Sequence, residues 1–298
     1  MRALVTGANG FVGSWLTAYL RERGDEVVGI DREVNVTDAA AVRDAIVAVS
    51  PDAVYHLAAL AHVGESWVNP GDVLLVNAIG TLHVLEAARA CAEPPRVLLT
   101  SSAEVYGSVV EEQLPVTEET PLAPVTPYAA SKVAAEYVGV QAHLAYGLPV
   151  VRVRPFNHIG PGQSAGFVVA ALAARIVEAA RIGATTIAVG NLEARRDLTD
   201  VRDIVRAYRL LMESGMPGEV YNVCSGRDVA IADVAQRLLR LAGTELTLVA
   251  DQDLMRPVDV PVVRGDPTKI HAATGWQPEF PLDTTLRDVL EQWREKVA

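Results

Sequence analysis

Short apolar segments alternate with helical segments along the first half of this chain, and the alternation limits the possible folds severely. Five runs are predicted as buried strands: RALVTG at 2–7, DEVVGI at 25–30, DAVYHLA at 52–58, RVLLTSS at 96–102 and LPVVRVRP at 148–155. Helical periodicity marks the segments 12–24, 39–49, 80–91 and 131–147 between them. Continuous apolar strands joined by amphipathic helices indicate an α/β fold with a doubly wound parallel sheet covered on both faces.

The pattern becomes less regular after Pro155. Helices are predicted at 167–183, 200–215, 231–243 and 286–297, and strands at 185–190, 219–226 and 244–250. We expect a Rossmann domain at 1–157 plus about 198–224, and a smaller α/β domain at about 158–197 and 225–298.

Composition excludes several classes of function. The chain has 298 residues, half of them apolar, and a net charge of −11 without a basic block, so neither nucleic acid nor an anionic membrane is an expected partner. Six scattered histidines and two unpaired cysteines, Cys91 and Cys224, give no metal-site pattern. Because no signal peptide is recognisable and the longest apolar stretch, 167–174, is short, we expect a cytoplasmic, soluble protein.

A glycine-rich segment, VTGANGFVG, follows the first strand and opens the first helix. Gly7, Gly10 and Gly13 allow a tight turn and leave the backbone N–H groups open to a pyrophosphate. Asp31 and Arg32 then end the second strand. An acid there accepts a hydrogen bond from a ribose 2′-hydroxyl, whereas an arginine suits a 2′-phosphate. The sequence therefore predicts a dinucleotide site and leaves NAD and NADP open.

A tyrosine and a lysine four residues apart, Tyr128 and Lys132, lie on one face of a predicted helix. A nearby cation favours phenolate, so we expect the pKa of Tyr128 to be lowered, which suits proton exchange with a sugar oxygen. Ser102 ends the fourth strand at the edge where ligands bind, and can hydrogen-bond a reacting carbonyl. Glu104 is a second candidate acid or base, with a structural role as the alternative.

Two further groups are candidates for substrate contact. Asn157 and His158 lie in the Pro/Gly-rich segment RPFNHIGPGQ, where the alternative is a turn capped by an amide. Arg195, Arg196 and Arg256 carry guanidinium groups that suit a pyrophosphate, although solvated charges are the alternative for each arginine.

Together these segments resemble the extended short-chain dehydrogenase/reductase family, of the epimerase/dehydratase type that acts on nucleotide sugars. The resemblance runs from VTGANGFVG through YHLAA, LLTSSAEVYG and YAASK to TGWQP. Three further segments, SWVNPGDVLLVNAIGTLHVLEA, RPFNHIGPGQ and VGNLEARRDLTDVRDIVRAYRLL, are most similar to reductases of GDP-6-deoxy-4-ketohexoses of the GDP-D-rhamnose-forming type. The large and small domains would then bind NAD(P) and the nucleotide sugar, respectively.

The resemblance implies a role for each matching residue. Ser102, Tyr128 and Lys132 would form the catalytic triad, with Glu104 beside it. Asn157, Arg196 and Arg256 would contact the sugar nucleotide, together with Ser102. The cofactor set would comprise Gly7, Asn9, Gly10, Phe11, Val12, Gly13, Asp31, Arg32, Val36, Leu57, Ala58, Ala59, Asn77, Tyr128, Lys132 and Pro155.

Reductase and dehydratase differ within this resemblance. GDP-mannose 4,6-dehydratases also carry an acid at the position of Glu104, so that residue does not separate the two. They have a long insertion after the second strand that supports a tetramer, whereas only 32–36 separate Asp31 from Thr37 here. The short link favours a reductase that uses NADPH or NADH, and a homodimer. The alternatives are a dehydratase, a 4-epimerase or, more distantly, a non-catalytic nucleotide sensor.

Overall fold

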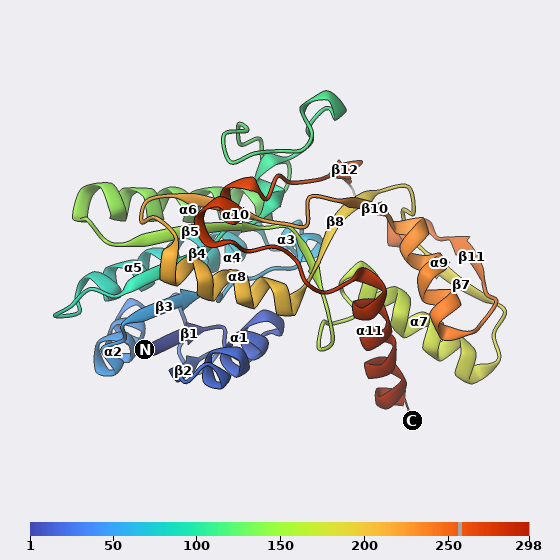
Figure 1. The fold of residues 1–298 in the computed structure, drawn as a ribbon, viewed down its shortest axis with the longest axis horizontal. Helices are drawn as coiled ribbons and strands as arrows, with labels where there is room; N and C mark the ends of the chain where they lie inside the picture. The colour runs from blue at the N-terminus through green and yellow to red at the C-terminus, as the bar shows by residue number, and fades with distance from the viewer. Residues whose placement is uncertain (256–257, 298) are drawn as a thin grey trace.

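A parallel sheet forms the larger part of the molecule (Figure 1). The computed structural model describes residues 1–255 and 258–297. Within them, a six-stranded sheet has the order β2-β1-β3-β4-β5-β9, and all its neighbouring strands run parallel. Its strands are β1 (Arg2–Thr6), β2 (Glu26–Ile30), β3 (Ala53–His56), β4 (Arg96–Thr100), β5 (Val150–Pro155) and β9 (Val220–Val223). The predicted doubly wound sheet is confirmed.

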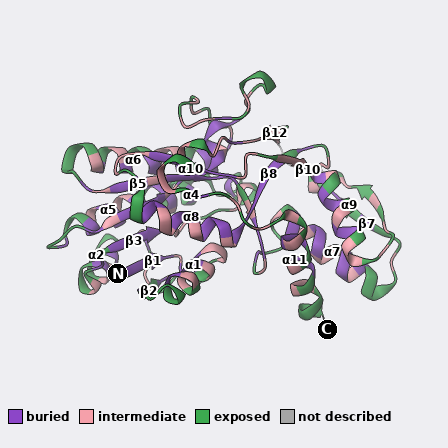
Figure 2. Ribbon diagram, in the orientation of Figure 1, coloured by how far each residue is buried: buried purple, intermediate pink, exposed green. Residues whose placement is uncertain are grey.

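Helices cover both faces of this sheet, which explains why its strands are apolar on both sides. On one face lie α1 (Phe11–Glu22), α8 (Val201–Ser214) and α10 (Thr268–Thr274). On the other lie α2 (Ala39–Val49), α5 (Gly80–Arg89) and α6 (Pro127–Tyr146). Figure 2 shows the central strands β1 and β3 as buried.

The end of the chain contributes to the first core. Ile270 on α10 and the fully buried Trp276 pack with α1 and α8, and the Trp276 indole N–H donates to the Asp203 carbonyl at 2.9 Å. This segment falls within the range 225–298 that the sequence assigned to the smaller domain. Hydrophobic periodicity shows that a helix has a buried face, but not which core receives it.

The smaller part of the molecule has its own core and lies to the right in Figure 1. Its helices are α7 (Val168–Ile182), α9 (Ile231–Ala242) and α11 (Leu282–Val297). Its strands are β6 (Asn157–Ile159), β7 (Thr186–Val189), β8 (Arg195–Asp200), β10 (Asp228–Ala230), β11 (Thr247–Ala250) and β12 (Val262–Val263). Strand β8 pairs with β6, β10 and β12, and β7 pairs with β11.

The predicted helix at 80–91 is the last part of a longer helical segment. This segment begins with α4 (Pro70–Leu74), passes through the π-helical η1 (Leu75–Ile79) and ends with α5. The short α3 (Val63–Ser66) precedes it. By length and composition alone Pro70–Arg89 could cross a bilayer, but half of that window is buried in the protein. It packs against α2 and α6, as a core helix does.

Topology locates the ligand site. The chain passes from β1 to β2 on one side and returns to β3 on the other, so the direction of winding changes between β1 and β3. Ligands of open α/β sheets bind beyond the carboxyl ends of the strands at such a point. Thr6 and His56 end these strands, and the short 3₁₀ helix η2 (Ala103–Tyr106) follows β4 at the same edge. Two further 3₁₀ turns are η3 (Glu111–Gln113) and η4 (Gln252–Leu254).

Candidate active site

The glycine-rich turn leaves no room for side chains. Gly7 has φ +69°, and a Cβ atom added there would lie 2.9 Å from the backbone nitrogen of Ala58. A Cβ on Gly13 would lie 2.0 Å from the Gly7 carbonyl oxygen. Gly10 caps α1 without a side-chain hydrogen bond, so the first N–H groups of the helix are open to an anion. This cradle fits the pyrophosphate of a dinucleotide.

Asp31 faces the same turn. Its carboxylate accepts hydrogen bonds from the backbone N–H of Asn9 and from that of Arg32, both at 2.9 Å. Arg32 itself is exposed beside it. The structure therefore brings the predicted ribose-binding acid and the predicted phosphate-binding arginine to one rim of the turn.

Buried side chains connect the ends of β1 and β3 to the first turn of α5. The Thr6 hydroxyl oxygen accepts the N–H groups of Leu57 and Ala58, each at 3.1 Å, so its proton points to His56 Nδ1 at 2.8 Å. His56 Nε2 then donates to Thr81 Oγ1 at 3.0 Å. Burial, with a smaller effect of the Lys132 charge, lowers the pKa of His56 to about 3, so the ring stays neutral. Through Thr6, His56 therefore helps to hold the backbone of Leu57 and Ala58, which directly follows β3.

Asn77 continues this network toward the tyrosine helix. Its amide oxygen accepts from the Leu60 N–H at 2.8 Å, and its amide nitrogen donates to Ser131 Oγ at 2.9 Å. Ser131 Oγ in turn donates to the carbonyl of Tyr128 at 2.7 Å. The Asn77 side chain is thus hydrogen-bonded to Leu60 and Ser131. Its direct contact with a cofactor stays a prediction.

The remaining predicted cofactor residues lie around the turn or beneath it. The Phe11 ring stacks on that of His158, with centroids 6.1 Å apart and planes within 6°. Val36 is buried against Gly80 at the start of α5. Val12 and Ala59 are partly exposed, and Pro155 is buried where β5 ends.

Ser102 and Tyr128 meet at the carboxyl edge of the sheet. Ser102 caps η2, where its side chain accepts from the Glu104 N–H at 3.2 Å, and it lies near enough to the Tyr128 phenol to favour the ionised form of that group. Tyr128 is the second residue of α6, whose N-terminus is capped by Thr126 Oγ1 on the Ala129 N–H at 3.0 Å. The four-residue spacing places Lys132 on the same face of α6, with its ammonium 6.0 Å from the tyrosine ring centroid.

The expected lowering of the Tyr128 pKa is wrong for this structure. Burial, with a contribution from the Glu104 charge, raises it to about 12, and the nearby Ser102 side chain only partly opposes that rise. Burial also lowers the pKa of Lys132 to about 8, and its Nζ donates to the Thr100 carbonyl at 2.9 Å. The sequence revealed the cation but not the burial of the pair. A neutral phenol is the form that can donate a proton.

The predicted substrate residues lie in different environments. Asn157 is exposed at the start of β6. Arg196 on β8 is buried and pairs with Asp259 at 2.5 Å, while its Nη1 donates to the Val260 carbonyl at 2.7 Å. Arg256 lies outside the described residues. Arg196 thus holds the segment at Asp259 and Val260. Substrate contact by Asn157, Arg196 or Arg256 stays a prediction.

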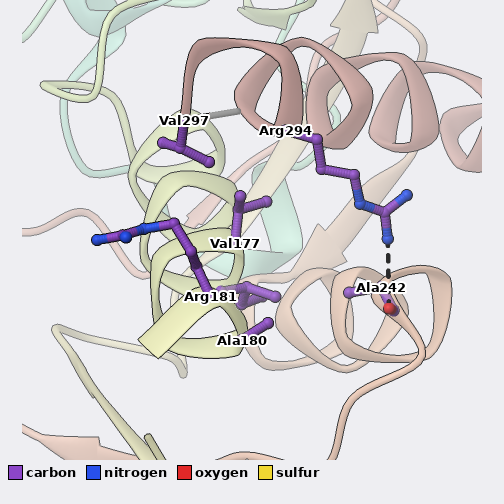
Figure 3. A pocket seen from close by; sticks show the side chains of 7 residues that line it. Val177, Ala180, Arg181, Ala242, Arg294 and Val297 are labelled. Carbon is purple, nitrogen blue, oxygen red and sulfur yellow. Dashed lines mark hydrogen bonds between the residues drawn. The ribbon is translucent and has the colours of Figure 1, made fainter. Parts of the chain in front are cut away.

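One small hollow in the molecule lies elsewhere. It has a volume of about 230 Å³ and is bordered by α7, α9 and α11, where the Arg294 guanidinium donates to the Ala242 carbonyl at 3.3 Å (Figure 3). Its lining is mostly apolar and includes none of the predicted site residues. Among the described residues, no group of three or more His, Cys, Asp or Glu is placed to hold a metal ion.

Comparison with known proteins fits this geometry. The family model for GDP-mannose 4,6 dehydratase matches residues 32–289. The chain belongs to this family. GDP-6-deoxy-D-mannose reductase of Pseudomonas aeruginosa is 38% identical over 99% of this chain and 98% of its own. GDP-6-deoxy-D-talose 4-dehydrogenase of Aggregatibacter actinomycetemcomitans is 30% identical over 98% of this chain and 96% of its own.

Solved structures of family relatives agree. RMD from Pseudomonas aeruginosa, complexed with NADPH, superimposes with a TM-score of 0.92 at 37% identity, covering 99% of this chain and 100% of that one. UDP-glucose 4-epimerase of Thermus thermophilus, complexed with NAD, superimposes with a TM-score of 0.88 at 30% identity, and 99% of each chain is covered. The predicted resemblance to NAD(P)-dependent nucleotide-sugar oxidoreductases is therefore confirmed.

Sequence reasoning missed the residues that support the site from below. Arg154 is buried and hydrogen-bonds Tyr106 on η2 and Glu136 on α6, which are buried too. His56 is buried between Thr6 on β1 and Thr81 on α5. A signal was present, because Arg154 interrupts a predicted buried strand and a charge there requires partners.

Proposed function

We propose that this protein reduces the 4-keto group of a GDP-4-keto-6-deoxyhexose to the GDP-6-deoxyhexose, of the GDP-D-rhamnose type. The observation that carries the proposal is 38% identity over nearly the whole chain to a GDP-6-deoxy-D-mannose reductase, in a chain that has Ser102, Tyr128 and Lys132 at one edge of the sheet. NADPH or NADH supplies the hydride when bound. The turn at Gly7, Gly10 and Gly13 and the Asp31–Arg32 rim would hold it.

The protein's own residues orient the sugar and move one proton. Ser102 donates a hydrogen bond to the 4-keto oxygen, and Tyr128, neutral because it is buried, gives that oxygen its phenolic proton. The Lys132 ammonium stabilises the phenolate that remains. Arg196 and Arg256 would bind the diphosphate and so fix the distance from the sugar to the cofactor.

A short link favours reductase over dehydratase. Strand β2 ends at Ile30 and α2 begins at Ala39, with Asp38 capping the helix through the N–H groups of Ala40 and Ala41. No long arm exists between them. A dehydratase is the second candidate, because the Glu104 carboxylate, which such an enzyme could use as an acid or base, lies close enough to raise the pKa of the Tyr128 phenol.

A substrate panel tests the proposal. The purified protein is incubated with GDP-4-keto-6-deoxymannose and either reduced nicotinamide cofactor, and with GDP-mannose without added cofactor. Oxidation of the nicotinamide together with a gain of two hydrogen atoms in the sugar supports the reductase. Loss of water from GDP-mannose supports the dehydratase, and 4-epimerisation of a UDP-sugar supports an epimerase.

We also propose a homodimer. Leu74, Leu75 and Ile79 on α4 and η1, and Tyr137 and Leu144 on α6, are large apolar side chains exposed on helices that pack against each other. Exposed apolar side chains gathered on neighbouring helices are typical of an interface. Light scattering that gives the mass of two chains supports the proposal, and the mass of one or of four chains contradicts it.

Two assignments remain proposals of the same kind. We place the protein in the cytoplasm, because Cys91 and Cys224 are buried free thiols, as expected in a reducing compartment. Residues 1–157 plus about 198–224 would bind the cofactor, and about 158–197 with 225–298 the nucleotide sugar, except that α10 and Trp276 pack into the core of the larger domain.

A further inference from the structure

A buried arginine on β5 makes a two-bonded fork with a carboxylate on the catalytic helix. Arg154 is 4% exposed and Glu136 is 1% exposed. Arg154 Nε donates to Glu136 Oε2 at 3.1 Å, and Nη2 donates to Oε1 at 2.5 Å. A bidentate pair fixes orientation as well as distance. The fork therefore sets how α6 lies over the sheet.

Glu136 occupies the face of α6 that carries the catalytic side chains. It follows Lys132 by four residues and Tyr128 by eight, which places all three along one side of the helix. Any rotation or slide of α6 that moved the Tyr128 hydroxyl would also have to break the fork to Arg154.

The same guanidinium also holds η2, the turn that Ser102 caps and that we call the serine turn. Arg154 Nη1 donates to Tyr106 Oη at 2.9 Å, and the guanidinium carbon lies 5.0 Å from the Tyr106 ring centroid. Tyr106 ends η2, the turn that begins directly after Ser102 and contains Glu104. One side chain thus touches both elements that carry the triad.

Hydrogen-bond directions around Tyr106 are fully determined. Its oxygen accepts from Arg154, so its proton goes to Asn222 Oδ1 at 2.7 Å. The Asn222 amide nitrogen, for its part, donates to the Val116 carbonyl at 3.1 Å. Burial raises the pKa of Tyr106 to about 12, which keeps the phenol protonated.

Arg154 also restrains the loop that leads into α6. Its Nη1 donates to the carbonyl of Glu118 at 3.1 Å, and the Glu118 carboxylate accepts from the Asn222 N–H at 2.7 Å. This loop ends at Thr126, the cap of the helix. The guanidinium therefore restrains the turn, the loop and the helix together.

We propose that Arg154 is a positioning residue that sets the distance between the Ser102 and Tyr128 hydroxyls by holding η2 through Tyr106 and α6 through Glu136. The inference rests on the proposed function, in which these two hydroxyls act together on one sugar oxygen. Because Arg154 acts through other residues, its loss weakens catalysis without removing a group that touches the substrate.

The chain offers a matched control. Arg152, on the same strand, also donates to Glu136 Oε1, at 3.2 Å, but its second bond goes to the Gly218 carbonyl at 2.6 Å and not to the serine turn. An Arg152→Lys variant therefore disturbs the same carboxylate while leaving the Arg154–Tyr106 link intact.

The experiment compares Tyr106→Phe, Arg154→Lys and Arg152→Lys with the wild type. Tyr106→Phe removes one hydroxyl and keeps the ring, so it is the variant expected to fold normally. We expect kcat to fall by about tenfold in Tyr106→Phe and by more in Arg154→Lys, with KM for cofactor and sugar nearly unchanged; about tenfold corresponds to the loss of one well-oriented hydrogen bond. Arg152→Lys should keep the wild-type kcat.

A double-mutant cycle separates positioning from simple stabilisation. If both side chains act through one link, adding Tyr106→Phe to Arg154→Lys lowers kcat little further. Full additivity of the two effects, or an equal loss of kcat in Arg152→Lys, would overturn the proposal. So would a wild-type kcat in Tyr106→Phe, whatever its stability.

A second readout does not need the proposed substrate. In the cofactor-free protein, Tyr106→Phe should speed amide hydrogen exchange at 102–106 and in the first turn of α6, whereas Arg152→Lys should not. If wild-type protein reduces no keto sugar, the proposed function fails alone, and exchange still tests the positioning role. Unchanged exchange in Tyr106→Phe contradicts the inference even where the reductase activity is found.

Discussion

Replacing Lys132 with methionine tests how strongly burial opposes the ammonium at the centre of the site. Burial lowers the pKa of Lys132 from 10.5 to about 8, a difference of about 2.5. At about 1.36 kcal/mol for each pKa unit, the buried charge is unfavourable by about 3 kcal/mol. Methionine keeps an unbranched apolar stem but loses the bond to the Thr100 carbonyl, worth about 1–2 kcal/mol. We therefore expect the free energy of unfolding of the cofactor-free Lys132→Met variant to exceed that of the wild type by about 1–2 kcal/mol at pH 7.

The sign of this effect depends on pH. Between about 8 and 10.5 the unfolded chain holds the lysine proton and the folded chain does not, so wild-type stability rises with pH across that window. The advantage of Lys132→Met should therefore shrink above pH 8, reverse between about pH 9 and 10, and leave the variant less stable at pH 10.5 by the lost hydrogen bond.

Urea unfolding of cofactor-free protein, followed by tryptophan fluorescence at several pH values, measures these differences. Lys296→Met removes an exposed lysine, which stacks over Trp293, and serves as the control for the loss of a lysine charge far from the site. A Lys132→Met variant that is less stable than wild type by the same amount at every pH would refute the reasoning.

Three further outcomes are expected. Tyr128→Phe should lower kcat by about 10²–10⁴-fold and leave cofactor affinity nearly intact, because it removes only the proton donor; normal turnover in that variant would contradict its role. Gly13→Ala should weaken cofactor binding at least tenfold in a fluorescence titration, because its methyl group would lie 2.0 Å from the Gly7 carbonyl oxygen; unchanged binding would exclude this turn as the cradle. Asp31→Asn should shift the kcat/KM ratio toward NADPH over NADH by about tenfold, since a negative charge leaves the rim; a shift toward NADH would oppose the assignment.

Much of the fold was predictable because local patterns determine it. Parallel strands buried on both faces need apolar residues at every position, and the chain shows five such runs before residue 156. The carboxyl ends of parallel strands share one edge, so the turn at Gly7 and the serine at 102 were expected together. The four-residue spacing of Tyr128 and Lys132 follows from helix geometry alone.

Features that depend on tertiary packing were not predictable. The direction of the Tyr128 pKa shift depends on burial, which no single segment reveals. The partners of Arg154 lie 48 and 36 positions away in Tyr106 and Glu118, far beyond any local pattern. The packing of Trp276 into the first core likewise depends on a chain return that periodicity does not encode.

The central claim is that this site delivers hydride to carbon 4 of a GDP-linked keto sugar while Tyr128 supplies the proton. Reaction of the wild type with GDP-4-keto-6-deoxymannose and nicotinamide deuterated at the transferred position tests it most directly. We expect one deuterium at carbon 4 of the product, as read by NMR, with one cofactor oxidised for each sugar reduced. Consumption of the sugar without deuterium at carbon 4, or without net cofactor oxidation, would contradict it.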